Sequence, residues 1–158
     1  MDPYTGDEAI CRLVETYSAM LLRIACTRLA STADAEDAVQ ETFLRLLTTR
    51  PRFRDAEHEK AWLIRTTLHR AADLRRAASV RDVPLTETLS ADQPEAEGDL
   101  LAAVRALPET YSAVIHLYYY EGYSIKEIAR LLGVPAATVG TRLARGRERL
   151  RLLLKEEA

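Results

Sequence analysis

The chain has 158 residues, with 22 basic and 24 acidic side chains, a formal net charge of −2 and a hydrophobic fraction of 47%. This is the composition of a globular protein with one medium domain or two small ones. No stretch approaches the roughly 18 apolar residues of a membrane span. The first ten residues lack the pattern of a signal peptide, so we expect a cytoplasmic protein with no membrane contact of its own.

Charge is distributed unevenly along the chain. Residues 1–49 carry a net charge of −4, residues 50–81 of +5, residues 82–112 of −6 and residues 113–158 of +3. Two basic segments separated by an acidic one predict two surfaces that face nucleic acid, joined by a segment that does not. Because affinity for phosphate grows with the number of charges neutralised, the small net charge argues against tight binding to free DNA.

The first helical pattern lies near the N-terminus. Thr5 and Glu8 form a capping box ahead of apolar residues at helical spacing, which predicts an amphipathic helix of about 24 residues with its apolar stripe in a core. Cys11 and Cys26 would lie ~22 Å apart on that helix, which is too far for a disulfide. We therefore expect both to pack as small apolar residues rather than to sense redox state.

A second helix is predicted to start at Ser31 or Thr32, and its two faces differ. The expected core face consists of Ala35, Ala38, Val39, Thr42, Phe43, Leu46 and Leu47. The opposite face consists of Asp37, Gln40, Glu41 and Leu44. An exposed leucine among acids and amides suits a partner surface. It equally suits a solvated face, and the residues alone leave both interpretations open.

A basic loop follows, because Pro51 is expected to stop the second helix. Arg50, Arg52 and Arg54 alternate there with other residues, and Phe53 stands among them. A basic loop with an aromatic residue can hold an unstacked base and its phosphates. Equally, the Phe53 ring can pack under the loop as part of the core.

A third helix, predicted for about residues 57–77, combines a half-apolar face with several arginines. Asp73 could pair with Arg65, Arg70 or Arg76 on this helix and weaken its positive field. The helical pattern ends in residues 79–98, which contain two prolines and an excess of acids. This composition is typical of a flexible linker.

After the linker, short helices are predicted for residues 99–107 and 108–120. Residues 123–150 then have the pattern of two helices joined by a tight turn. Ser124 and Glu127 form another capping box. Gly133 is suited to end the first of these helices, and Pro135 to begin the second. The pattern predicts a helix-turn-helix.

These patterns predict an all-α protein of two small helical domains joined by a flexible acidic linker. We expect the first domain at residues 1–78, the linker at 79–97 and the second domain, which contains the helix-turn-helix, at 98–158.

One face of the last helix carries hydroxyl and guanidinium groups in a single stripe. Its members are Thr138, Thr141, Arg142, Arg145 and Arg149. Such a stripe suits phosphates and guanine edges in a DNA major groove. The alternative is an ordinary solvated basic helix.

Taken as a whole, the chain resembles a bacterial extracytoplasmic-function (ECF) sigma factor, the minimal two-domain class of the sigma-70 family. The segments that carry the resemblance are DAEDAVQETFLRL (34–46), AWLIRTTLHRAADLRR (61–76) and residues 107–150, in this order around a short acidic linker. The resemblance implies a protein that directs core RNA polymerase to promoters by recognising a −10 and a −35 element.

The resemblance also implies roles for three groups of residues. The face formed by Asp37, Gln40, Glu41 and Leu44 is expected to dock on a coiled coil of the largest polymerase subunit. The −10 element is expected to contact Arg50, Arg52, Phe53, Arg54, Trp62, Arg65, His69 and Arg70. The −35 element is expected to contact Thr138, Thr141, Arg142, Arg145 and Arg149, of which Thr141, Arg142 and Arg145 read the bases.

One pair of residues differs from housekeeping sigma factors, and two positions depart from the family pattern. Trp62 and Leu63 stand where housekeeping sigma factors have two aromatic residues, so we expect weaker autonomous strand separation. His69 stands where an asparagine is usual, either as a buried neutral histidine bonded to a backbone carbonyl or as a DNA contact. Gly140 stands where a basic residue is common, and it costs roughly 1 kcal/mol of helix propensity relative to alanine.

We expect a non-enzymatic mechanism with no cofactor and no metal, because His58, His69 and His116 lack metal-ligand spacing and the sequence has no glycine loop for phosphate. The resemblance implies core RNA polymerase, promoter DNA and an anti-sigma factor as partners. The main alternative is a stand-alone helix-turn-helix regulator that binds operator DNA. A second alternative is an adaptor that sequesters sigma factors.

Overall fold

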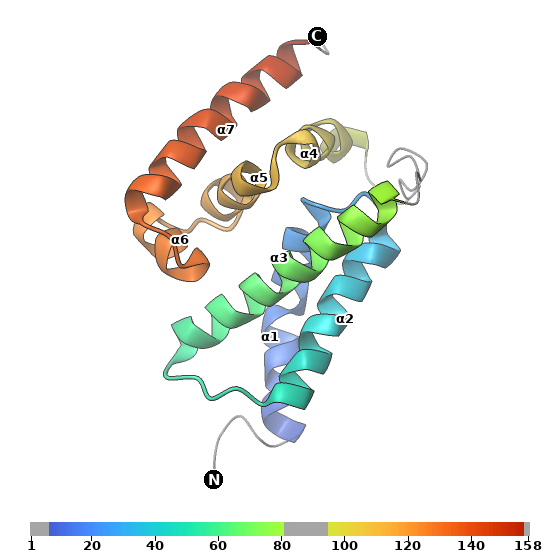
Figure 1. Cartoon of the computed structure of the whole chain (residues 1–158), viewed down its shortest axis with the longest axis vertical. Coiled ribbons are helices and arrows are strands. Elements are labelled where there is room, and N and C mark those ends of the chain that lie inside the picture. The colour runs from blue at the N-terminus through green and yellow to red at the C-terminus, as the bar shows by residue number, and fades with distance from the viewer. Residues whose placement is uncertain (1–6, 81–94, 157–158) are drawn as a thin grey trace.

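The structure, a computed structural model, describes residues 7–80 and 95–156. In these residues it contains helices and no strands, so the predicted all-α class is confirmed. The N-terminal lobe consists of α1 (Asp7–Cys26), α2 (Thr32–Thr49) and α3 (Ala56–Val80) (Figure 1). The C-terminal lobe consists of α4 (Glu95–Ala106), α5 (Glu109–Ile115), the π-helical segment η2 (His116–Tyr120), α6 (Ile125–Leu132) and α7 (Ala136–Glu156). Most of the predicted linker lies outside the described residues.

Local signals in the sequence set the ends of α2. The Ser31 hydroxyl accepts a hydrogen bond from the Asp34 backbone N–H at 3.2 Å, which satisfies one of the free amides at the helix start. At the other end Arg50 adopts the left-handed conformation, with φ of 43°, and its N–H donates to the Leu46 carbonyl. The expected core face is confirmed except at Leu47, which is 38% exposed because it lies at the edge of the apolar stripe.

The described part of the first helix, α1, has 20 residues, where about 24 were predicted. The expected capping residue Thr5 lies outside the described residues. Cys11 is exposed and Cys26 is half-buried, and both are free thiols, so no disulfide joins them.

The helix-turn-helix formed by α6 and α7 is confirmed. Ser124 and Glu127 exchange both capping-box hydrogen bonds, at 3.1 and 3.0 Å. Gly133 ends α6 with φ of 69°, a conformation that glycine adopts without the clash of a Cβ atom. Val139 and Leu143 of α7 are buried with Ile128 of α6.

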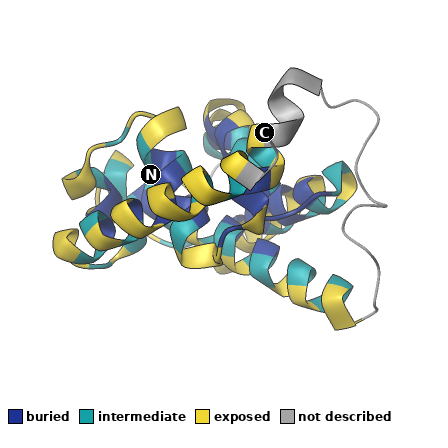
Figure 2. Cartoon of the chain, turned by 90° about the horizontal axis from the view of Figure 1, so that it is seen from above, coloured by how far each residue is buried: buried dark blue, intermediate teal, exposed yellow. Residues whose placement is uncertain are grey.

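The two lobes share one hydrophobic core. A single cluster of buried residues runs from Leu13 in α1 to Leu143 in α7. Figure 2 shows the buried residues on the faces of the helices that turn toward the interior. Helix α3 lies between the other N-terminal helices and the C-terminal lobe, where it packs against α6.

A buried arginine joins the lobes. Arg28 is 3% exposed and donates hydrogen bonds to the Leu107 carbonyl at 3.2 Å and to the Ser112 hydroxyl at 2.6 Å. Burial, together with the nearby charge of Arg75, lowers the Arg28 pKa to about 10, so the side chain remains a cation at neutral pH. Glu109 lies 3.9 Å away and partly balances this charge.

Two glycines of α7 have opposite surroundings and give a matched test of packing. A Cβ atom on Gly146 would lie 2.9 Å from the Ile115 side chain, whereas one on Gly140 would meet nothing within 4 Å. We predict that Gly140→Ala raises the free energy of unfolding by about 1 kcal/mol through helix propensity. Gly146→Ala should lower it by about 1–3 kcal/mol, because α5 and α7 must move apart. Urea unfolding followed by circular dichroism measures both, and a stabilised Gly146→Ala would contradict the close packing.

The buried Arg28 contact gives a second prediction. Arg28→Met leaves the Ser112 hydroxyl and a backbone carbonyl without their donor, so we expect the free energy of unfolding to fall by about 3 kcal/mol. Arg151→Met is the matched control, since Arg151 pairs with Glu148 on the exposed side of α7. Loss of an exposed pair should change stability by less than about 1 kcal/mol. Equal effects of the two substitutions in urea unfolding would refute the bridging role of Arg28.

Candidate nucleic-acid and partner interfaces

The predicted polar stripe of α7 lies along a groove between α5 and α7. The groove has a volume of about 410 Å³ and is lined by Thr110, Tyr111, Ala137, Thr138, Thr141, Arg142 and Arg145. It therefore brings together four of the five residues that we predicted to contact the −35 element. Thr141 and Arg145 are exposed, while Thr138 and Arg142 are half-buried.

The fifth predicted residue lies beside the same groove. The Arg149 guanidinium lies 5.4 Å from the centre of the Tyr111 ring, a distance typical of a cation–π contact. Tyr111 and Thr110 were not among the predicted residues. They belong to α5, and the sequence pattern of α7 contains no signal of which helix packs beside it.

The predicted basic loop divides into outward and inward side chains. Arg52 and Arg54 are exposed, and the Arg54 backbone N–H donates to the imidazole of His58 at 3.1 Å. Phe53 is only 9% exposed, with its ring edge-on to His58 and Trp62 at centroid distances of 5.4 and 6.0 Å. The core interpretation of Phe53 therefore holds for this conformation, in which its ring anchors the loop to α3.

Two further predicted residues of α3 lie near the loop and α2. Trp62 is half-buried against the Phe53 ring. Arg70 is half-buried and forms an ion pair with Asp37 at 3.3 Å, so it links α3 to the acidic face of α2. Of the three arginines that the sequence offered as partners of Asp73, it is Arg76 that forms the ion pair.

Arg65 and His69 face the other lobe. Arg65 donates to the backbone carbonyls of Leu131 at 2.7 Å and Arg130 at 2.8 Å, which are free acceptors at the C-terminus of α6. His69 is exposed rather than buried, so the interpretation as a buried histidine was wrong. His69 borders an open cleft between α3 and the C-terminal lobe.

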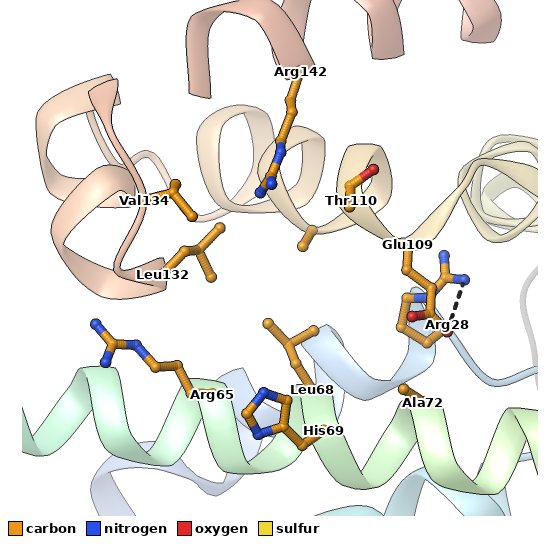
Figure 3. Close-up of a pocket in the computed structure, with 11 residues that line it drawn as sticks. Arg28, Arg65, Leu68, His69, Ala72, Glu109, Thr110, Leu132, Val134 and Arg142 are labelled. Carbon is orange, nitrogen blue, oxygen red and sulfur yellow. Dashed lines mark ion pairs between the residues drawn. The ribbon is translucent and has the colours of Figure 1, made fainter. Parts of the chain in front are cut away.

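This inter-lobe cleft has a volume of about 270 Å³. In Figure 3, Leu68 of α3 points into it from one side and Arg142 of α7 from the other. Its remaining lining residues are Arg28, Arg65, His69, Ala72, Glu109, Thr110, Ala113, Leu132 and Val134. The cleft thus brings residues predicted for the −10 element next to a residue predicted for the −35 element.

A network of ion pairs and hydrogen bonds also joins the two lobes. Arg23 of α1 donates two hydrogen bonds of 2.9 Å to the Glu121 carboxylate, which also lies 2.8 Å from the His116 ring. Burial raises the Glu121 pKa, but the hydrogen bonds from Arg23 and His116 outweigh it and hold that pKa below its usual value. Burial lowers the pKa of His116. The Glu121 carboxylate is therefore charged when it pairs with Arg23.

The predicted partner face of α2 is open to solvent. Leu44 is 53% exposed, which confirms the expected exposed apolar residue, and Gln40 is exposed as well. The Asp37 and Glu41 side chains are 48% and 38% exposed, and the latter lies 4.0 Å from Arg45. On this face the acidic side chains of Asp37 and Glu41 surround the exposed Leu44. Such a combination suits a partner that is basic and partly apolar.

None of the helices in residues 7–80 and 95–156 is both long enough and apolar enough to cross a membrane. Within the same residues, no three or more His, Cys, Asp or Glu side chains form a group that could hold a metal ion.

Comparison with known proteins finds related families for both lobes of the chain. The family described as Sigma-70 region 2 matches residues 13–81, and the family described as Sigma-70, region 4 matches residues 97–150. The ECF RNA polymerase sigma factor SigL of Mycobacterium tuberculosis is 34% identical, over 91% of this chain and 88% of its own length. SigE of Mycolicibacterium smegmatis is also 34% identical, over 93% of this chain but 63% of its own length.

Two solved structures share the fold. CnrH in complex with the cytosolic domain of CnrY has a TM-score of 0.72 and 24% identity, over 97% of this chain and 92% of that one. RpoE in complex with the anti-sigma factor NepR from Bartonella quintana has a TM-score of 0.70 and 22% identity, over 91% of this chain and 95% of that one. At these identities the likeness concerns the fold.

Proposed function

Since the chain belongs to the sigma-70 family, as an RNA polymerase sigma factor of the ECF class, we propose that it guides core RNA polymerase to promoters through a −10 and a −35 surface. The role is non-enzymatic. The observation that carries the proposal is the groove between α5 and α7, where the hydroxyl and guanidinium groups of a helix-turn-helix lie side by side.

The −35 surface is the exposed stripe on the N-terminal half of α7. An α-helix fits the major groove of duplex DNA, and arginine donates two hydrogen bonds to the edge of guanine. Thr141 and Arg145 are exposed at this position, and Arg142 lies between them. Arg149 and Thr138 flank these readers, and their contacts to phosphate would set the register without reading sequence.

The −10 surface is formed by the basic loop and α3. Arg50, Arg52 and Arg54 supply positive charge for a single strand, and Trp62 supplies an aromatic surface on which a base can stack. The inward Phe53 ring fixes the loop on α3 in the described conformation. Arg65, His69 and Arg70 extend the basic surface along α3.

Core polymerase docks on the α2 face formed by Asp37, Gln40, Glu41 and Leu44. The exposed Leu44 provides the apolar anchor, and the surrounding acids favour a basic partner. This face distinguishes a sigma factor from a stand-alone operator-binding regulator, which has no need of a polymerase surface. The solved complex of RpoE with the anti-sigma factor NepR supports an anti-sigma factor as a further partner.

Transcription in vitro separates the proposed function from an adaptor that sequesters sigma factors. Core RNA polymerase is supplied with a promoter mapped from transcript start sites after overexpression of this chain. A sigma factor starts transcription from that promoter, whereas an adaptor only inhibits. Absence of initiation with active core enzyme would refute the proposal.

If core polymerase docks on α2, a charge placed on the exposed face of this helix should prevent binding. Leu44→Asp places a carboxylate where the apolar anchor meets polymerase, so the variant should no longer co-elute with core enzyme on gel filtration. Leu100→Asp is a matched control, because Leu100 is 54% exposed and lies in the other lobe. Circular dichroism should show an intact fold for both, and unchanged co-elution of Leu44→Asp would refute the docking surface.

If α7 contacts the −35 element, a substitution on its polar stripe should weaken promoter binding without weakening core polymerase binding. Arg145→Ala should weaken promoter binding by the holoenzyme about 10-fold or more, since a two-bond arginine–guanine contact contributes about 1–3 kcal/mol. Arg147→Ala is the control, because Arg147 lies on another side of α7 and donates to the Tyr119 hydroxyl at 2.9 Å. Both variants should bind core polymerase normally. Parallel loss of core and promoter binding in Arg145→Ala would refute the division between the two lobes.

A further inference from the structure

Helix α5 contributes an aromatic residue to the groove that carries the proposed −35 surface. Tyr111 of α5 lines this groove together with the threonines and arginines of α7. We propose that Tyr111 positions the guanidinium of Arg149 for a contact to one phosphate of promoter DNA, so that binding of the −35 element uses α5 as well as the helix-turn-helix. This inference rests on the proposed −35 surface and adds a positioning residue to it.

The contact between Tyr111 and Arg149 joins a fixed ring to a long exposed side chain. The Arg149 guanidinium lies 5.4 Å from the centre of the Tyr111 ring, where the negative face of the ring attracts a cation. Tyr111 is half-buried and Arg149 is exposed. An exposed arginine has many rotamers, and ordering such a side chain on binding costs free energy. The ring therefore reduces the freedom that Arg149 must lose when it binds a phosphate.

The charge of Arg149 remains available because its partner is a neutral ring. The neighbouring arginines of α7 have other partners: Arg147 donates to the Tyr119 hydroxyl, and Arg151 pairs with Glu148. Among the side chains that the structure describes, no carboxylate forms an ion pair with Arg149. The contact thus holds the guanidinium in place without neutralising it, as a phosphate site requires.

The close approach of α5 and α7 brings the ring to Arg149. A Cβ atom on Gly146 would lie 3.4 Å from the Tyr111 Cβ atom, so the two helices meet at this glycine. Arg149 follows Gly146 by three residues, which is about one helical turn. Side chains on an α-helix point back toward its N-terminus. The Arg149 side chain therefore reaches back over the turn of Gly146, where Tyr111 lies.

The position of Arg149 along α7 suits a phosphate rather than a base. In a helix-turn-helix the N-terminal residues of the second helix contact base edges. Arg149 follows Thr141 by eight residues, or about 12 Å along the helix axis, which is about the width of the major groove. When Thr141 reaches the bases, Arg149 lies near the phosphates that border the groove. Such a contact strengthens binding and sets register without reading sequence.

The test compares loss of the ring with loss of the cation. Holoenzyme is assembled from core polymerase and each variant, and its affinity for the mapped promoter is measured over a series of salt concentrations. Tyr111→Leu removes the ring and retains an apolar side chain, whereas Tyr111→Phe retains the ring. Arg149→Ala removes the cation, and the double variant Tyr111→Leu with Arg149→Ala completes a double-mutant cycle.

Tyr120→Leu is the matched control. The Tyr120 ring lies 5.6 Å from the Arg23 guanidinium, so this substitution also removes a contact between a ring and an arginine. Tyr120 does not line the groove between α5 and α7. Its replacement should leave promoter affinity unchanged.

We expect Tyr111→Leu to weaken promoter binding about two- to fivefold, the size of an exposed cation–π contact. Arg149→Ala should weaken it at least as much, and it should reduce the slope of log affinity against log salt by about 0.9, since one phosphate contact is lost. Tyr111→Phe should bind like the wild type, and the double variant like Arg149→Ala alone. These losses should be equal for promoters that differ in their −35 sequence.

Three outcomes would overturn the proposal. The first is unchanged promoter binding by Tyr111→Leu. The second is a further loss of the same size when Tyr111→Leu is added to Arg149→Ala, because the ring would then act without the cation. The third is an equal loss in Tyr111→Phe, because the hydroxyl rather than the ring face would then matter. If Tyr111→Leu loses its helical circular dichroism, Tyr111→Met replaces it, with the same expected result.

The Arg145→Ala experiment separates this inference from the proposed function. Unchanged promoter binding by Arg145→Ala would refute the −35 surface itself. If Arg145→Ala weakens promoter binding and Tyr111→Leu does not, the −35 surface stands and only the positioning role of Tyr111 is refuted.

Discussion

Arg28 is the constraint on which the arrangement of the two lobes depends. A guanidinium that is 3% exposed has lost its water, and it is tolerated only because the Leu107 carbonyl, the Ser112 hydroxyl and the Glu109 carboxylate replace part of that water. All three partners belong to the C-terminal lobe. Removing that lobe would leave the charge without partners or return it to solvent, so the end of α1 and the start of α5 are positioned together.

This constraint explains why the larger cluster of buried residues in the described chain spans both lobes. With α5 held by Arg28, which follows α1, helix α6 lies on α3 and its terminal carbonyls meet Arg65. The opposite side of α5 supports α7, where Gly146 allows the helices to approach closely. The groove that carries the proposed −35 residues is therefore a product of the same packing that holds the lobes together.

Several arginines have both a structural and a proposed functional role. Arg65 caps the end of α6, and Arg70 pairs with Asp37 of the proposed polymerase surface. A cation that is already hydrogen-bonded within the protein must exchange these partners for phosphates when it binds DNA. These internal hydrogen bonds therefore compete with phosphates for the arginines that we propose to contact DNA.

The sequence by itself determined the all-α class, the helix-turn-helix and the two faces of α2. These features depend on interactions between residues three or four apart, such as the capping box of Ser124 and Glu127, and on apolar spacing along one helix. The exposed Leu44 and the groove-lining threonines and arginines of α7 followed from the same periodicity.

Tertiary structure alone decided which partner each long polar side chain meets. Periodicity placed Leu47 in the core, yet Leu47 lies at the edge of the buried stripe. One of the two interpretations of His69 was a buried histidine, yet His69 borders an open cleft. Arg65 reaches carbonyls that are 65 and 66 residues away in the chain. No local pattern encodes such a distance, because it depends on how two helical lobes dock rather than on how any one helix forms.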